Sequence, residues 1–254
     1  MPLVTFTSDF GNGDHYVAAV RAAILGKDAS VQVIDISHDI EPFNLPHLAF
    51  TIKSVFKQFP TGTIHLVGLN GNDTADEYLV VKLEEHLFLL PDNGLIGLLS
   101  DQPPTEVVLI KSEANSLFPT LDLLAPIALA LSKGESLENF GAITSDYKRM
   151  VSRRVKATRK EIAGHIIHVD QYGNLISNIN KIDFDILSKE KKFKIQIGKE
   201  SSNRIHLKYQ DVEPSDIFFV FNSLGLLEVG MNEGNANLLL GLGFDAAINI
   251  QFEE

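Results

Sequence analysis

The chain has 254 residues, no cysteine and a formal net charge of −11 at pH 7. A chain without cysteine has neither a disulfide framework nor a thiolate metal site, and a strongly acidic balance argues against a general nucleic-acid binder, because phosphate contacts need clustered cations. No apolar run approaches the roughly 20 residues of a membrane span, and the first residues lack a signal-peptide pattern, so we expect a cytoplasmic protein with no membrane segment.

Strand-like and helix-like segments alternate in the first part of the chain. Asp14 and Asn44 are plausible N-caps for two of the helices, and Pro46 suits the first turn of the second. Helices are expected at 14–26, 44–59 and 121–132, and strands at 3–9, 31–37, 63–69, 78–83, 87–90 and 106–111. This alternation predicts an α/β domain over residues 1–150, with a mostly parallel sheet and helices on both faces.

The pattern changes after a basic stretch. Residues 151–162, which overlap the basic run 147–160, are interpreted as a solvated linker. Short alternating or apolar runs then recur at 164–170, 174–180, 192–198, 204–210, 216–222, 226–232 and 246–252. Regular short strands of this kind predict an all-β barrel domain over residues 163–254.

Polar side chains follow the first two expected strands. Ser8, Asp9 and Gly11 come directly after the first strand, at the sheet edge where ligands of α/β proteins bind. The Asp9 carboxylate could accept hydrogen bonds from a ribose diol, or it could only shape its loop as an Asx-turn. His38 and Asp39 follow the second strand, and with no third ligand evident we interpret them as loop-bracing residues rather than as part of a metal site.

Two turns of the second domain carry further candidates. Asp170, Tyr172 and Asn174 could hold a cationic amine, stack on a flat base and read its edge, or they could form an ordinary hairpin turn. The second turn region carries glycines that let a ligand approach the backbone, although turn chemistry alone would also explain it. Its candidates are Asn222, Ser223, Gly225, Gly234 and Asn235.

Six motifs in order resemble one family. They are "TSDFGNGDHYVAAVRAAI", "ISHDIEPFNLPHLAF", "FPTGTIHL", "PDNGLIGLL", "HVDQYGNLISNI" and "NSLGLLEVGMNEGNANLLLGL". Together they are similar to S-adenosyl-L-methionine (SAM) hydrolases of the hydroxide adenosyltransferase type, which are related to SAM-dependent fluorinases and chlorinases. The resemblance implies a homotrimer that binds SAM between the N-terminal domain of one subunit and the C-terminal domain of the next. It implies no cofactor besides the SAM substrate and no metal.

The resemblance also implies roles for individual residues. Asp9 would accept the ribose hydroxyls and Asp170 would pair with the ammonium group of the methionine part. Tyr172 would cover the adenine and Asn174 would read its edge. The remaining implied contacts are Ser223 with the methionine carboxylate, the backbone near Asn235 and Ala236 with the adenine, and Phe118, which the chain retains.

The reacting part of the family pattern is not retained. Hydrolases typically read "VVDPGVGTxRR" where this chain reads "LVGLNGNDTAD", so Leu69 and Asp76 occupy the positions of the family Asp and Arg. Pro119 occupies the position of the family His. Thr120 stands where a halogenase has a small halide-binding hydroxyl. The catalytic residues are therefore unknown, with Asn72, Asp73 and Thr120 as candidates.

Two functions follow as hypotheses. The first is an enzyme that displaces methionine from C5′ of SAM with water or hydroxide, giving adenosine and methionine. The second is a catalytically weak or inactive homologue that binds SAM or adenosine. Halogenase-like use of another nucleophile is a further alternative.

Overall fold

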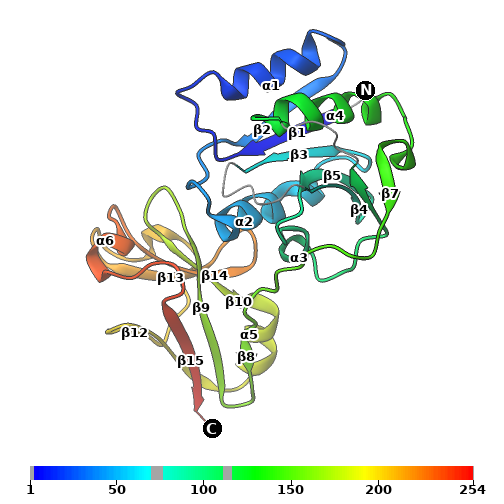
Figure 1. Cartoon of the computed structure of the whole chain (residues 1–254). Helices are drawn as coiled ribbons and strands as arrows, with labels where there is room; N and C mark the ends of the chain where they lie inside the picture. The colour runs from blue at the N-terminus through cyan, green and yellow to red at the C-terminus, as the bar shows by residue number, and fades with distance from the viewer. Residues whose placement is uncertain (1–2, 70–76, 111–115, 254) are drawn as a thin grey trace. The chain divides into compact units, whose positions relative to one another are not determined.

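The protein forms two compact units, Met1–Val151 and Ser152–Glu254. The computed structural model describes residues 3–69, 77–110 and 116–253, and each unit is described by itself. In the first unit the elements alternate along the chain (Figure 1). They are β1 (Leu3–Ser8), α1 (Tyr16–Leu25), β2 (Gln32–Ser37), α2 (Leu45–Val55), β3 (Ile64–Gly68), β4 (Tyr78–Leu83), β5 (His86–Pro91), α3 (Ile96–Leu99), β6 (Glu106–Ile110), α4 (Ala125–Ser132) and β7 (Gly141–Ile143).

These strands form a seven-stranded mixed sheet in the order β2-β1-β3-β5-β4-β6-β7. Neighbouring strands are parallel from β2 to β5 and antiparallel from β5 to β7. The expected mostly parallel sheet is therefore wrong for the half beyond β5. The reason is the short β4–β5 turn, in which Glu84 and Glu85 both have positive φ, because a two-residue turn of this type reverses the chain into an antiparallel hairpin.

Helices cover both faces of this sheet, as expected (Figure 1). Alternate strand residues point to opposite faces, so Val80 belongs to one apolar cluster while Leu79 and Val81 belong to the other. The first cluster includes the buried residues of α1 and α4, and the second includes those of α2 and α3. The sheet is thus enclosed between two apolar layers, and its functional groups must lie at an edge.

The helix starts are confirmed in one case and wrong in another. Asn44 caps α2, since its side chain accepts a hydrogen bond from His47 N at 2.9 Å, and Pro46 lies in the first turn. Helix α1 begins after His15, whose side chain makes no capping bond, so Asp14 is not the cap. The helix expected at 121–132 begins with a π-helical turn, Thr120–Leu124, before α4.

The second unit is an eight-stranded antiparallel sheet that curls into a nearly closed barrel. The path is β12-β11-β15-β9-β10-β14-β13, with β8 paired to β9. The strands are β8 (Lys156–Ala157), β9 (Glu161–Val169), β10 (Leu175–Asn180), β11 (Lys192–Ile197), β12 (Glu200–Ser202), β13 (Ile217–Phe221), β14 (Leu226–Met231) and β15 (Ala247–Glu253). Their inward-facing side chains form one apolar core.

Residues 204–210, expected to be a strand, form a loop and a short 3-10 helix, Tyr209–Asp211. The backbone N–H groups of Leu207 and Lys208 donate to the Asp211 carboxylate rather than to a neighbouring strand. His206 N donates to Phe219 O at 2.7 Å, so this loop bridges to β13 where the barrel is open. Two short helices, α5 (Lys181–Leu187) and α6 (Ala236–Leu240), were not predicted.

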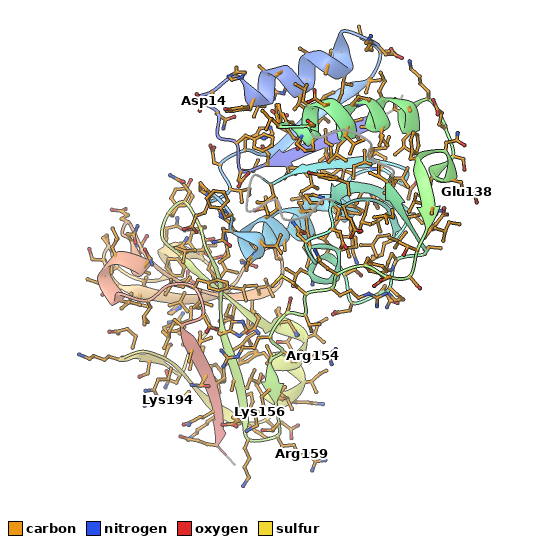
Figure 2. The ribbon with its side chains drawn as sticks, viewed as in Figure 1. Asp14, Glu138, Arg154, Lys156, Arg159 and Lys194 are labelled. Carbon is orange, nitrogen blue, oxygen red and sulfur yellow. The ribbon has the colours of Figure 1, made fainter. Side chains whose placement is uncertain are left out.

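The basic stretch is partly structured. β8 pairs with β9 inside the expected linker, and the ion pair between Lys156 and Glu161 spans their turn at 2.7 Å. Arg154 and Arg159 are exposed on the second unit (Figure 2). Within the described part of the chain, no helix is long and apolar enough to cross a membrane.

Three buried polar side chains form a chain inside the first unit. Thr5 Oγ1 lies 2.7 Å from His65 Nδ1, and His65 Nε2 lies 3.1 Å from His86 Nδ1. His65 is 1% exposed, and burial lowers its pKa to about 3. Burial also lowers the pKa of His86. The folded unit therefore keeps His65 neutral at pH values where an unfolded histidine takes up a proton.

This difference predicts an acid-dependent loss of stability. Because the folded pKa of His65 lies below the unfolded value of 6.5, the unfolded state binds the extra proton, and stability is lost as pH falls below 6.5. At pH 5 the expected cost is about 2 kcal/mol of unfolding free energy. Urea unfolding at pH 7 and pH 5 measures it. A His65→Gln variant should show a shallower loss, and exposed His15→Gln should match the parent. Equal losses in all three proteins would contradict the assignment.

Candidate functional site

The first candidate site lies at the edge where three neighbouring strands end. β1 pairs in parallel with both β2 and β3, so the loops after all three strands leave the same edge of the sheet. Asp9 follows β1, Pro42 and Phe43 come from the loop after β2, and Leu69 follows β3. The segment before α4 reaches the same edge with Leu117, Phe118, Pro119 and Thr120.

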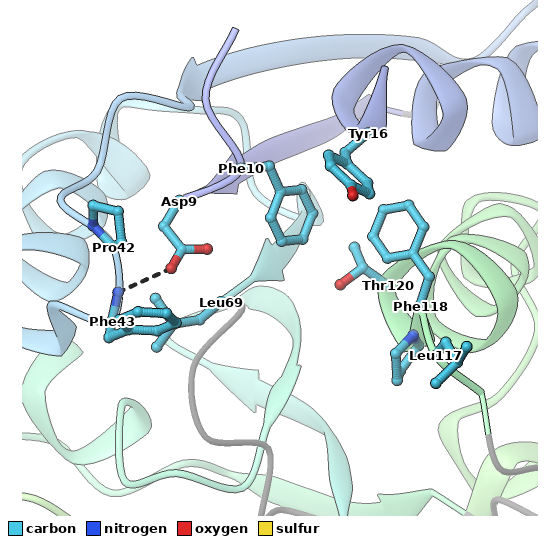
Figure 3. Close-up of a pocket in the computed structure, with 10 residues that line it drawn as sticks. Asp9, Phe10, Tyr16, Pro42, Phe43, Leu69, Leu117, Phe118 and Thr120 are labelled. Atoms are coloured by element: carbon cyan, nitrogen blue, oxygen red, sulfur yellow. Dashed lines mark hydrogen bonds between the residues drawn. The ribbon is translucent and has the colours of Figure 1, made fainter. Parts of the chain in front are cut away.

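These segments enclose a pocket of about 310 Å³ (Figure 3). Asp9 forms part of one wall, and Thr120 stands across the pocket from it. The pocket therefore brings together Asp9, Phe118 and Thr120, which the sequence singles out from distant parts of the chain. Its volume lies at the lower end of the range for ligand sites, which suits a sugar-sized group better than a whole nucleoside with an amino-acid tail.

Aromatic rings make up one wall of the pocket. Phe118 packs edge-to-face against Phe10 at 5.4 Å and against Tyr16 at 5.5 Å between ring centroids. Gly68, the last residue of β3, makes this packing possible. A Cβ at Gly68 would lie 2.6 Å from the Phe10 ring and 3.1 Å from Thr120 Oγ1, so any side chain there would displace the wall.

Asp9 is held in place by its neighbours. Its Oδ2 accepts a hydrogen bond from Phe43 N at 3.0 Å (Figure 3). Behind it, Ser8 Oγ lies 2.7 Å from His38 Nδ1, and His38 Nε2 lies 3.2 Å from Asp35 Oδ1. The contact with Asp35 does not have hydrogen-bond geometry, so the bond to Ser8 is the one that holds the His38 ring. The interpretation of His38 as a bracing residue is confirmed.

The Ser8–His38 pair is structural. Ser8 is fully buried and so cannot reach a substrate as a nucleophile. Burial of His38, with the nearby positive charge of Arg21, lowers the pKa of the imidazole to about 4. Arg21 is itself ion-paired with Asp35. At neutral pH the ring is therefore uncharged and acts as a fixed hydrogen-bond partner below the Asp9 loop.

The positions where the family pattern departs also fall on this pocket. Leu69 and Pro119 both line it, so neither position carries a group that moves a proton. Thr120 supplies a hydroxyl and is 7% exposed. The remaining candidates, Asn72 and Asp73, lie outside the described residues, as does Asp76. Among the described residues, no group of three or more His, Cys, Asp or Glu side chains could hold a metal ion.

The second candidate region is the turn between β9 and β10. The Asp170 carboxylate organises it, because Oδ1 accepts hydrogen bonds from Tyr172 N and Asn174 N, and Oδ2 accepts one from Asn174 Nδ2. Gly173 has φ +82, and a Cβ there would lie 2.2 Å from Asn235 Oδ1. The turn and Asn235 are therefore packed together, whereas Tyr172 is 75% exposed.

The remaining candidates lie on either side of β14. Asn235 caps α6 by accepting from Leu238 N, and Ala236 is the buried first residue of that helix. Ser223 is exposed in the β13–β14 turn. The preceding residue, Asn222, donates from Nδ2 to the buried carboxylate of Glu228 at 3.0 Å.

Sequence reasoning missed Glu228 as well as the pocket residues Phe10, Tyr16 and Phe43. Glu228 occupies an outward position in an alternating strand, where a charged residue is ordinary, so its burial gives no sequence signal. The three aromatic residues stand in loops or at a helix start, and only the folded chain gathers them at one edge.

Family comparison finds two matches that together span most of the chain. Residues 4–141 match the SAM hydroxide adenosyltransferase N-terminal domain, and residues 164–249 match the C-terminal domain of the same family.

Similar proteins agree with this match. An (R)-S-adenosyl-L-methionine hydrolase from Methanocaldococcus jannaschii is 27% identical over 98% of this chain and 96% of its own. A fluorinase from an Actinoplanes species is 21% identical over 72% of this chain and 74% of its own. A crystal structure of an uncharacterized conserved protein from Thermotoga maritima superposes with a TM-score of 0.87 at 26% identity, covering 98% of this chain and 99% of that one.

The bracing of the Asp9 loop generates a stability prediction. Replacing His38 with Leu leaves the buried Ser8 hydroxyl without its imidazole partner, which should lower the free energy of unfolding by about 1–3 kcal/mol. Adding Ser8→Ala removes the orphaned hydroxyl and should recover part of the loss. Urea unfolding of the two variants measures both effects. A single variant as stable as the parent would show that the Ser8–His38 bond does not anchor this loop.

Proposed function

Because the chain belongs to the SAM hydroxide adenosyltransferase family, we propose that it is a SAM hydrolase. The proposed reaction displaces L-methionine from C5′ of the ribose with water or hydroxide and gives adenosine and methionine. The observation that best supports this proposal is the pocket at the ends of β1, β2 and β3. It gathers Asp9, Phe118 and Thr120 around a sugar-sized space.

The proposed binding contacts match the chemistry of each part of SAM. In the pocket, the Asp9 carboxylate accepts hydrogen bonds from the ribose hydroxyls. Phe43 N already fixes its orientation by donating to Oδ2. In the second unit, Asp170 pairs with the ammonium group, Tyr172 covers the adenine and Asn174 reads its edge. Ser223 contacts the methionine carboxylate, and the backbone at Asn235 and Ala236 meets the adenine. A cation, a flat ring and a carboxylate each meet a complementary group.

The chemistry makes few demands on the protein. The C5′–S bond breaks and its electron pair goes to the sulfonium sulfur, so methionine leaves as a neutral thioether without an acid. A C5′–O bond forms, and the water proton passes to solvent. Catalysis then depends on placing a partly desolvated oxygen nucleophile in line with the C–S bond. The aromatic wall of Phe10, Tyr16 and Phe118 excludes water from part of this space.

The nucleophile's surroundings differ from those the family pattern implies. Leu69 and Pro119 line the pocket and offer neither charge nor a hydrogen bond, so we propose that the Thr120 hydroxyl, with Asn72 or Asp73 from the neighbouring segment, orients the attacking water. Positioning without a general base leaves a smaller rate enhancement.

The apolar character of the pocket favours a second candidate. Thr120 is a hydroxyl within a wall formed largely by Leu117, Phe118, Pro119 and Leu69. Such surroundings suit a weakly hydrated anion that accepts a hydrogen bond from Thr120, as in halogenase-like substitution. Binding of SAM or adenosine without turnover is the other alternative.

We further propose that the protein forms a homotrimer, with the pocket residues and the Asp170 turn of neighbouring copies sharing each ligand. The small volume of the pocket supports this, because it leaves the adenine and the methionine tail to be bound elsewhere. Light scattering during gel filtration should give the mass of three chains. A monomer that still turns over SAM would contradict the shared site. The cytoplasmic location remains a prediction.

Incubation of the purified protein with SAM tests the proposed function. We expect adenosine and methionine above a no-protein control, separated by chromatography.

Asp9→Asn should lose SAM affinity at least tenfold, because the amide loses charge and one acceptor for the ribose hydroxyls. Asp14→Asn, an exposed aspartate five positions away, should behave as the parent.

The other outcomes separate the alternatives. A 5′-halo product that appears only with added halide would replace the hydrolase assignment with the halogenase-like one. Intact SAM that raises the melting temperature would indicate binding without turnover. A parent protein that neither binds nor converts SAM would reject the proposed function.

A further inference from the structure

A buried acid lies beside the two turns to which the proposed function assigns the amino-acid end of SAM. Glu228 on β14 is 3% exposed. Its strand neighbours Leu227 and Val229 point into the barrel core, so Glu228 points to the opposite face of the sheet. Acids are rarely buried to this extent unless neighbouring groups compensate them.

One of its neighbours shapes the turn that carries Ser223. Glu228 Oε2 accepts from Asn222 Nδ2 at 3.0 Å. The other end of the Asn222 carboxamide, Oδ1, accepts from Leu224 N and Leu226 N at 3.0 and 3.1 Å. The Asn222 side chain is thus fixed between the turn backbone and the buried carboxylate, and Ser223 follows directly in the chain.

The second neighbour covers the acid. Tyr209 stacks on Phe218 at 4.6 Å between ring centroids, and its hydroxyl lies beside the Glu228 carboxylate. Burial and the charge of Glu228 raise the pKa of Tyr209 to about 12, so the phenol stays neutral. Glu228 Oε1 has no hydrogen-bond partner of standard geometry among the described residues.

The third neighbour is the carboxylate assigned to the ligand's ammonium group. Burial raises the pKa of Glu228, and the negative charge of Asp170 also raises it, while the Asn222 amide and the nearby Tyr209 hydroxyl act in the opposite direction. Two carboxylates that repel each other in a partly buried region are both stabilised in their charged forms by a nearby cation. In the antiparallel register of β10 and β14, Glu228 pairs with Ile176, two residues beyond Asn174 of the Asp170 turn.

We propose that Glu228 is a positioning residue for the amino-acid end of SAM. It fixes the Asn222–Ser223 turn by accepting from Asn222, and its negative charge adds to that of Asp170 at the ammonium group. This inference rests on the proposed function. It assigns Glu228 no contact with the reacting C5′ carbon, and it predicts an effect on SAM that adenosine, which lacks the amino-acid end, does not share.

The test compares the two ligands on matched variants. In Glu228→Gln, which keeps the shape and removes the charge, the Kd for SAM should rise about tenfold while the Kd for adenosine stays within about twofold. If the enzyme turns over, KM for SAM should rise with kcat nearly unchanged, because the lost interaction is made equally in ground and transition states. Glu213→Gln, the same change at an exposed glutamate of this unit, should match the parent.

A second variant guards against misfolding of the first. Asn222→Ala keeps Glu228 and removes its hydrogen-bond donor, and it should also weaken SAM binding selectively. If Glu228→Gln melts far below the parent, Asn222→Ala carries the comparison. Equal losses for SAM and adenosine would indicate a merely structural role and overturn the inference, as would parent-like affinity in both variants. A parent protein that binds neither ligand would instead reject the proposed function.

Discussion

The parallel pairing of β1 with β2 and β3 is the constraint on which the first candidate site depends. Parallel strands present their carboxyl ends at one edge, so three loops separated by tens of residues meet there. Asp9, Phe43 and Leu69 become neighbours for this reason alone. Beyond β5 the sheet is antiparallel, and no such convergence of loop ends is required of its other half.

The close approach of the Gly68 backbone to neighbouring side chains at this edge explains the shape of the pocket. Gly68 leaves room for the Phe10 ring and Thr120, which then pack with Phe118 and Tyr16 into a continuous wall. A wall of this kind is apolar and offers no base. It therefore suits a substitution whose leaving group is neutral and whose requirement is alignment of the nucleophile.

Buried polar groups supply the rigidity in both units. His38 holds Ser8 beneath the Asp9 loop, His65 joins Thr5 to His86, and Glu228 holds the Asn222 side chain. Each is expensive to leave unpaired in a low-dielectric interior. These groups consequently favour one conformation of the segments that they contact. The exposed residues of those segments are held in place as a result.

The sequence alone determined the two-part organisation, because periodicity changes from strand–helix alternation to short repeated strands near residue 150. It also determined the cap at Asn44 and the family, through six ordered motifs. It missed the antiparallel half of the first sheet and wrongly expected a strand at 204–210, since a positive-φ turn at Glu84 and Glu85 and side-chain bonds from Asp211 override local pattern. Only the tertiary structure decided which aromatic residues line the pocket and that Glu228 is buried. Those properties arise from contacts between segments far apart in the chain, which local patterning does not encode.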